Sequence, residues 1–168
     1  MKKVLETERT YLRELTIADA ESFYRLNLDK EVVQYTGDVA FESINHAKLF
    51  LENYDQYAKY GIGRWAVIHK ETEEFLGWCG LKFTLTPYEY DIGFRFFKKH
   101  WNQGYATETA KACIEYGFNT MQVARIIGRA MKANVASVKV LEKIGLGYER
   151  DFDFDGNTGV IHAITAII

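Results

Sequence analysis

A glycine loop between a strand and a helix is the part of the chain best suited to chemistry. It lies within residues 91–108, which read DIGFRFFKKHWNQGYATE, and Gly104 stands directly before the helical part. The first N–H groups of a helix have no intrahelical acceptor, and the helix dipole favours negative charge there. Gly104 would let a phosphate approach the backbone, and the small Ala106 would let the first helical turn approach the sheet. The pattern is compatible with a pyrophosphate site, although spacing alone favours a glycine that simply eases the turn.

Other chemistry has little support in the sequence. The loop lacks the three glycines of a dinucleotide site, and no G-x-x-x-x-G-K-[ST] motif for nucleotide hydrolysis occurs. The four histidines have no metal-ligand spacing, so no metal site is expected. Cys79 and Cys113 do not form a C-x-x-C pair and are interpreted as buried, reduced thiols.

Composition excludes several further classes of protein. The chain has 168 residues, 48% of them hydrophobic, which suits one domain with a sizeable core. Its formal net charge of -2 gives no attraction to nucleic acid or to an anionic membrane surface. The start of the chain turns acidic, and no run approaches the ~18 apolar residues of a membrane span. A cytoplasmic location is therefore expected.

Apolar periodicity divides the chain into the elements that would position the loop. Helices are predicted from the Asp19 cap, from Ser43 to the stop at Gly61, along the stripe that begins at Ala106, and from Asn134 to Gly145. Strands are predicted over residues 10–15, 64–69, 75–83, 88–96, 124–131, 148–154 and 160–168. The order β-α-α-β-β-β-α-β-α-β-β predicts a mixed α/β sandwich.

Three segments resemble the GNAT superfamily of N-acetyltransferases. Trp101-Asn102-Gln103-Gly104-Tyr105-Ala106 is similar to its acetyl-coenzyme A signature Q/R-x-x-G-x-G/A, with Trp101 in place of Gln or Arg. W-x-x-G-Y-A-T-E resembles the branch of the RimJ and RimL ribosomal-protein N-terminal acetyltransferases. The segments 7–13, TERTYLR, and 134–145, NVASVKVLEKIG, resemble the same branch. The resemblance implies one α/β domain over residues 7–168, with a mostly antiparallel twisted sheet and helices on both faces.

The resemblance also implies how acetyl-coenzyme A would lie. The strand before the loop would splay from its neighbour, and the pantetheine arm would pair with backbone at Phe94, Phe96 and Phe97. The phosphates would meet the N–H groups of Asn102, Gln103, Gly104, Tyr105, Ala106 and Thr107. The Asn134 side chain would bond the pantetheine, and Ser137 would face the thioester. Without the resemblance, an N-cap followed by an exposed serine is the favoured reading of Asn134 and Ser137.

The implied reaction is direct attack by a neutral amine on the acetyl carbonyl. Glu89 and Asp91 share a strand face, so either could accept the amine proton, and Asp91 is preferred. Arg95 lies on that face too and could pair with them in a solvated charge ladder. Many relatives have a tyrosine at the position of Leu141 that protonates the departing sulfur. In its absence, Ser137 remains as a hydrogen-bond donor to the sulfur.

Three functional readings stay open. The acceptor is the α-amine of a protein, as the RimJ/RimL resemblance implies, or a small amine such as a polyamine, amino sugar or antibiotic. The third reading is a non-catalytic acyl-coenzyme A-binding module, which Leu141 permits and which Asn134 and Ser137 disfavour. Acceptor choice is expected to reside in residues 36–60 and at the strand end near Tyr88. A monomer and a homodimer are both compatible with the sequence.

Overall fold

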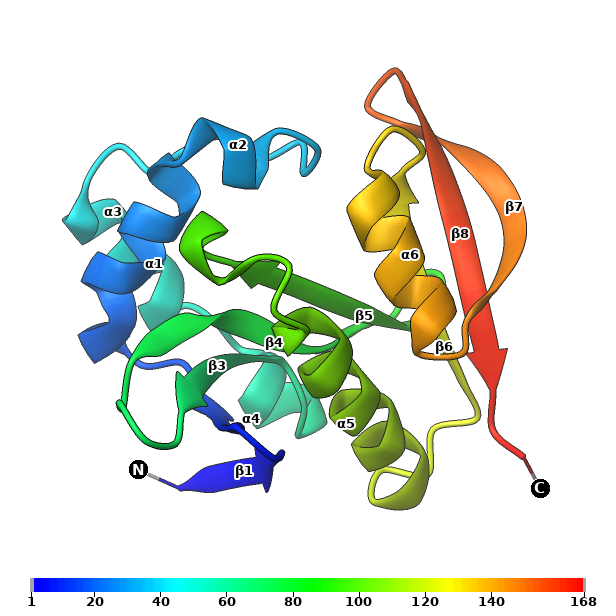
Figure 1. Ribbon diagram of the computed structural model, residues 1–168, viewed down its shortest axis with the longest axis horizontal. Coiled ribbons are helices and arrows are strands. Elements are labelled where there is room, and N and C mark those ends of the chain that lie inside the picture. The colour runs from blue at the N-terminus through cyan, green and yellow to red at the C-terminus, as the bar shows by residue number, and fades with distance from the viewer. Residues whose placement is uncertain (1, 168) are drawn as a thin grey trace.

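Eight strands form one open sheet in the computed structural model of the chain, which describes residues 2–167 (Figure 1). The strand order is β1-β2-β3-β4-β5-β6-β8-β7, and only the β5–β6 pair is parallel. The strands are β1 (Lys3–Glu6), β2 (Thr10–Glu14), β3 (Arg64–His69), β4 (Phe75–Thr84), β5 (Glu89–Phe96), β6 (Arg125–Met131), β7 (Gly147–Phe154) and β8 (Asn157–Thr165). The helices are α1 (Ala20–Leu28), α2 (Lys30–Val33), α3 (Ile44–Glu52), α4 (Gln56–Tyr60), α5 (Tyr105–Asn119) and α6 (Val135–Lys143), with 3-10 turns η1 (Ile17–Asp19) and η2 (Lys98–His100).

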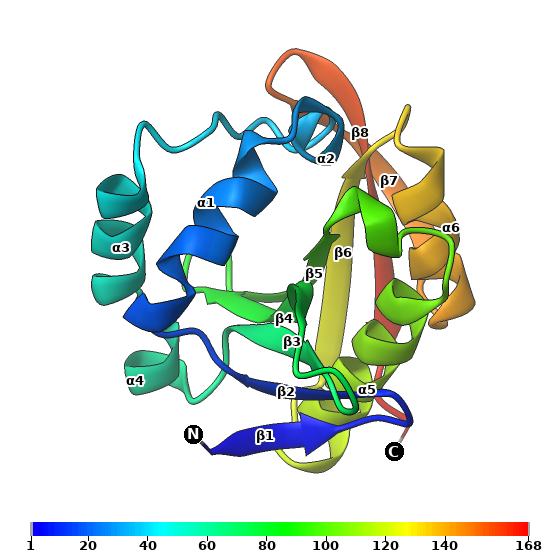
Figure 2. The ribbon, with the colours of Figure 1, turned by 60° about the vertical axis from the view of Figure 1, so that its left-hand side comes forward.

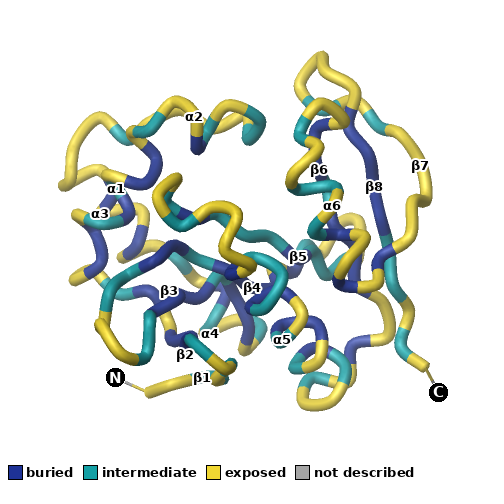
Figure 3. Tube along the Cα trace, in the orientation of Figure 1, coloured by how far each residue is buried: buried dark blue, intermediate teal, exposed yellow. Residues whose placement is uncertain are grey.

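Helices cover both faces of the sheet, as predicted (Figure 2). Alternation along β3 explains the two layers, because neighbouring side chains of a strand point to opposite faces. Trp65 and Val67 join the core beneath α5, where Trp65 meets Tyr116 at 5.3 Å between ring centroids. Ala66 and Ile68 join the smaller core beneath α1 and α3. Buried residues therefore concentrate along the central strands (Figure 3).

The β5–β6 pair separates soon after it forms. These strands share a single register position, Asp91 opposite Ile127, so the part of β5 from Ile92 to Phe96 has no strand partner on that side. On the far side of the gap, α6 lies close to β6. A Cβ on Gly128 would lie 2.5 Å from Leu141 Cδ2, so glycine is required there for this close approach. The expected splay is thus present beside α6 (Figure 1).

The predicted helix over residues 43–60 is wrong in one respect, because the chain breaks it into α3 and α4. Both the backbone N–H and the side-chain amide of Asn53 donate to Leu49 O, at 3.1 and 2.8 Å, and end α3. The break lets two tyrosines reach the sheet. Arg64 N donates to Tyr54 Oη at 2.8 Å, and Leu15 N donates to Tyr57 Oη at 3.0 Å.

Strand β1 lies before residue 7 and pairs with β2, and the sequence did not predict it. Two further expectations need correction. The Asp19 side chain does not cap α1; it accepts bonds from Thr16 N and from both terminal nitrogens of Arg13, each at 2.8 Å. The last strand starts earlier than residue 160 and ends at Thr165, and Ile168 lies outside the described residues. None of the helices within residues 2–167 combines the length and apolarity needed to cross a membrane.

Candidate active site

The glycine loop is held between the end of β5 and the start of α5. Trp101 Nε1 donates to Phe96 O at 2.9 Å, and Gln103 Nε2 donates to Lys99 O at 2.8 Å. Asn102 and Gly104 both have left-handed backbone, with φ of 58° and 83°. Asparagine and glycine tolerate this conformation better than other residues do. The tryptophan that departs from the family pattern therefore fixes the loop to the strand.

The loop presents a row of free donors. Within residues 2–167, the backbone N–H groups from 102 to 107 have no acceptor, and the first to bond is Glu108 N, to Gly104 O at 3.0 Å. A Cβ on Gly104 would have one neighbour within 4 Å, Arg9 Nη2 at 3.4 Å. The open space and the free donors fit a pyrophosphate, which needs several N–H groups close to its oxygens.

The strand before the loop contributes less backbone than expected. Phe94 lies in the unpartnered part of β5, and Phe96 is a core residue whose carbonyl accepts the Trp101 indole. Phe97 N donates to Leu76 O at 3.1 Å, and its carbonyl accepts His100 N at 2.9 Å. The Phe97 N–H is thus not free to pair with a pantetheine amide.

The start of α6 lies across the gap from this strand. Asn134 Oδ1 accepts Ser137 N at 3.3 Å, so the capping role of Asn134 is confirmed. The half-buried Ser137 hydroxyl has no hydrogen-bond partner in the described part of the chain. Leu141 is 2% exposed and lies in the core beside Ile92, so it presents no polar group to the gap.

A cluster of charged side chains occupies the face of β5 opposite to the one that carries Ile92. Arg129 on β6 binds Glu89 through Nη2 and Asp91 through Nη1, the latter at 3.1 Å. Arg64 Nη2 lies 3.9 Å from Asp91 Oδ2, and Arg64 Nη1 donates to the main-chain oxygens of Gly80 and Asp91 at 2.6 and 2.8 Å. Burial raises the pKa of Asp91 above its usual range, although Arg64 and Arg129 oppose the rise.

Arg95 does not join this cluster, so the ladder of Glu89, Asp91 and Arg95 is wrong. Arg95 instead donates to Asn27 Oδ1 and Asp38 Oδ2, both at 2.7 Å. It thereby ties β5 to the end of α1 and to the loop after α2. The contacts of Arg64 and Arg129 with the carboxylates of β5 were not predicted, because the two partners of each pair lie far apart in the sequence and no local pattern indicates such a pair.

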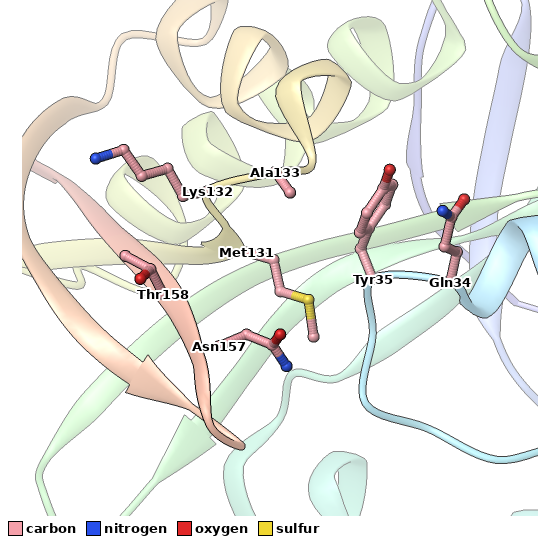
Figure 4. A pocket seen from close by; sticks show the side chains of 7 residues that line it. All are labelled: Gln34, Tyr35, Met131, Lys132, Ala133, Asn157 and Thr158. Atoms are coloured by element: carbon pink, nitrogen blue, oxygen red, sulfur yellow. The ribbon is translucent and has the colours of Figure 1, made fainter.

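A cavity of about 480 Å³ opens between the loop after α2 and the ends of β6 and β8 (Figure 4). Its side chains carry amide, hydroxyl, thioether and ammonium groups and come from three separate segments: Gln34, Tyr35, Met131, Lys132, Ala133, Asn157 and Thr158. Met131 O accepts Asn134 N at 2.9 Å, so the cavity borders the start of α6. The expected acceptor region, residues 36–60 with Tyr88, supplies none of these residues.

Metal and thiol chemistry have no site in the described residues. No group of histidine, cysteine, aspartate and glutamate within residues 2–167 is placed to hold a metal ion. Cys79 and Cys113 are both buried, with their sulfurs 3.8 Å apart. Burial raises the pKa of the Cys113 thiol well above its usual range, which disfavours the nucleophilic thiolate.

Residues 9–147 match the family model described as acetyltransferase (GNAT) domain. The chain belongs to the GNAT acetyltransferase family. It is 31% identical over 152 residues to the uncharacterized N-acetyltransferase YoaA of Bacillus subtilis, covering 89% of this chain and 85% of YoaA. It is 39% identical over 97 residues to the uncharacterized protein YkkB of the same species, and this match spans about half of each chain, 54% in both cases.

The fold of this GNAT chain is shared with solved relatives. RimL, a ribosomal L7/L12 α-N-protein acetyltransferase solved in complex with coenzyme A, superposes with a TM-score of 0.83 over 98% of each chain. At 13% sequence identity this likeness establishes the architecture alone. The family match and the N-acetyltransferase relatives assign the chain as an N-acetyltransferase.

Replacing Gly104 with valine tests the phosphate loop. The β-branched side chain would disfavour φ of 83° and fill the space over the free N–H groups, so we expect acetyl-coenzyme A affinity to fall more than 10-fold. Gly156→Val is the matched control, because Gly156 has the same φ of 83° and lies in the β7–β8 turn with no atom within 4 Å of its Cβ position. Calorimetric titration of both folded variants gives the answer; equal affinity in the two would show that Gly104 serves only the turn.

Proposed function

We propose that this GNAT enzyme transfers acetyl from acetyl-coenzyme A to the N-terminal α-amine of a protein, by direct attack in a ternary complex. The observation that carries the proposal is the splayed β5–β6 pair flanked by a loop with six free N–H groups. Bound acetyl-coenzyme A supplies the thioester. The N–H groups from 102 to 107 hold its phosphates, and Phe94 and Asn134 line the pantetheine path.

The chemistry of the acceptor amine favours an α-amine. Near pH 7.4 a lysine amine with a pKa of about 10.4 is neutral roughly once in a thousand, which costs about 4 kcal/mol. An N-terminal amine with a pKa near 7.8 loses under ~1 kcal/mol. The Asp91 carboxylate, whose charge the neighbouring arginines partly offset, is a modest base. It therefore suits the α-amine, which needs little help to lose its proton.

The cavity beside α6 supports the same acceptor. Gln34 and Asn157 offer amide groups, and Tyr35 and Thr158 offer hydroxyls, which match the donors and acceptors of a peptide backbone. The lining residues include Lys132 and no carboxylate, so a polyamine would bring positive charge to a site that has nothing to pair with it. The likeness to RimL, whose acceptor is a protein α-amine, agrees with this choice.

Asp91 and Ser137 take the two proton-related roles in the proposal. Asp91 lies on the face of β5 opposite Ile92, and Ile92 faces α6 with Leu141. Asp91 accepts the amine proton, directly or through water, and its raised pKa makes it a better base than an ordinary aspartate. Ser137, at the start of α6, donates its unpartnered hydroxyl to the sulfur as negative charge develops there.

A screen of acceptors tests the proposed substrate. Thiol release from acetyl-coenzyme A is measured with short peptides that have a free N-terminus, with the same peptides blocked at the N-terminus, and with spermidine and an aminoglycoside. We expect turnover with the free peptides, none with the blocked ones, and at least 10-fold lower kcat/KM with the small amines. Preference for a small amine would show that the acceptor is a small molecule rather than a protein. If acetyl-coenzyme A binds but no amine is acetylated, the chain is a non-catalytic binding module.

Asp91→Asn tests the proton acceptor through its pH profile. In the wild type the Asp91 carboxylate is present above its raised pKa, and the neutral form of the acceptor amine is scarce below the pKa of that amine, so a proton acceptor matters most between these two values. We therefore expect the variant to lose most turnover below pH 7, about 10-fold or more, and to recover in part as pH rises. Glu89→Gln, which alters the other carboxylate bound to Arg129, should keep the wild-type profile. A uniform loss at every pH would indicate that Asp91 only positions its neighbours.

Ser137→Ala tests stabilisation of the leaving group. A hydrogen bond that strengthens as thiolate charge develops lowers the barrier more than it aids ground-state binding. We expect turnover at saturating acceptor to fall roughly 10- to 1,000-fold with little change in acetyl-coenzyme A affinity. Lys139→Ala, an exposed change on the same helix, serves as the control. An unaltered turnover number in Ser137→Ala would remove the hydroxyl from the reaction.

A further inference from the structure

The phosphate loop has no cation of its own. The family pattern begins with Gln or Arg, and here Trp101 uses its indole to hold the loop to Phe96. No lysine or arginine occurs from residue 101 to 108. Lys98 and Lys99, just before the loop, pair with Glu31 and Glu74. A pyrophosphate over this loop would therefore need its positive partner from another element.

Arg9 occupies that position from the turn between β1 and β2, which lies next to α5 (Figure 2). Its Nη2 lies 3.4 Å from the Cβ position of Gly104, and apart from residues next to Gly104 in the chain it is the only neighbour within 4 Å among residues 2–167. Its guanidinium carbon lies 4.1 Å from the ring centroid of Tyr105, the first residue of α5. Such stacking holds an arginine flat while leaving its edge available.

Glu108, one turn into α5, fixes the same guanidinium. Arg9 Nε and Nη2 bind Glu108 Oε2 at 2.8 and 2.7 Å, and Arg9 N and Thr7 Oγ1 donate to Oε1 at 2.9 and 2.7 Å. Partial burial alone would raise the pKa of Glu108, but these bonds together lower it, so the carboxylate is charged at neutral pH. Within residues 2–167, Arg9 Nη1 has no acceptor.

We propose that Arg9 is a phosphate-binding residue of this enzyme, which Glu108 and Tyr105 aim at the pyrophosphate of coenzyme A. The inference rests on the proposed use of acetyl-coenzyme A. Nη1 supplies the charge-assisted hydrogen bond, and the guanidinium also shields the phosphates from the Glu108 carboxylate. The pyrophosphate is the group concerned, rather than the 3′-phosphate, because Arg9 lies over Gly104 and the free N–H groups beside it.

Affinities for three probes separate a phosphate contact from a structural role. The probes are coenzyme A, dephospho-coenzyme A, which keeps the pyrophosphate, and acetyl-pantetheine, which has no phosphate. Arg9→Met should weaken binding of the first two by about 10- to 100-fold and of acetyl-pantetheine less than 2-fold. Arg9→Lys should give an intermediate loss, since lysine keeps the charge without the planar fork.

Arg25→Met is the matched control, because Arg25 is a surface arginine paired with Glu21 on α1 and far from the loop in sequence. It should leave all three affinities unchanged. The double variant Arg9→Met/Glu108→Gln addresses shielding: it should remain weaker than wild type toward coenzyme A, because the contact from Nη1 is still missing. Full recovery of coenzyme A affinity in the double variant would show that Arg9 only screens the charge of Glu108. It would overturn the proposed contact between Arg9 and the phosphate.

Two other results would overturn the inference. One is binding of coenzyme A by Arg9→Met as tight as that of the wild type. The other is a loss of affinity for acetyl-pantetheine as strong as the loss for coenzyme A, which marks a merely structural role. A loss restricted to coenzyme A, with dephospho-coenzyme A unaffected, would move the contact to the 3′-phosphate. If wild-type protein binds no coenzyme A at all, the proposed function fails, and this outcome is distinct from the failure of Arg9 alone.

Discussion

The separation of β5 from β6 after a single paired position is the constraint on which the site depends. Backbone N–H and C=O groups inside a sheet normally pair, and a central strand with a free edge is costly unless something else satisfies it. Here the free edge runs from Ile92 to Phe96, in the middle of the sheet. The free N–H groups of α5 lie at one end of this edge, and the start of α6 lies across from it. The proposed acetyl-coenzyme A, an extended ligand with amides and phosphates, would satisfy the edge and the helix end together.

Local signals predicted much of this arrangement. The strand at residues 64–69 and the Asn134 cap agree with the structure, because both depend on short-range pattern. The β1 strand was missed because its four residues carry no alternation strong enough to mark a strand. The helix break at Asn53 was missed because apolar spacing continues through it, while a side-chain bond to Leu49 ends the helix. Apolar spacing indicates which face of a helix is buried. It does not indicate where a side-chain amide binds a backbone carbonyl and ends the helix.

The electrostatics of the site could not be predicted, because each pair joins distant segments. Arg64 on β3 reaches across β4 to Asp91 on β5, and this path exists only because Gly93 has no side chain. A Cβ on Gly93 would lie 2.6 Å from the Arg64 guanidinium carbon. Gly93 thereby admits Arg64, which together with Arg129 opposes the rise that burial causes in the pKa of Asp91. The order of residues in the sequence does not indicate that these side chains come together in the fold.

In the proposed reaction, the two faces of the sheet divide the chemistry of acyl transfer. Asp91 lies on the same face of β5 as Arg95, which ties the strand to the end of α1 and to the loop after α2. Ser137 lies at the start of α6, on the side of the sheet that Ile92 faces. A thioester in the gap between β5 and β6 would have the proton acceptor on the amine side and the hydroxyl donor on the sulfur side. Attack and departure can then occur on one carbonyl without the acetyl group moving. A covalent acyl-enzyme has no comparable support, since both thiols are buried and the Cys113 thiol is held protonated by its raised pKa. The geometry thus favours direct transfer, with the sheet itself separating the two proton-related groups.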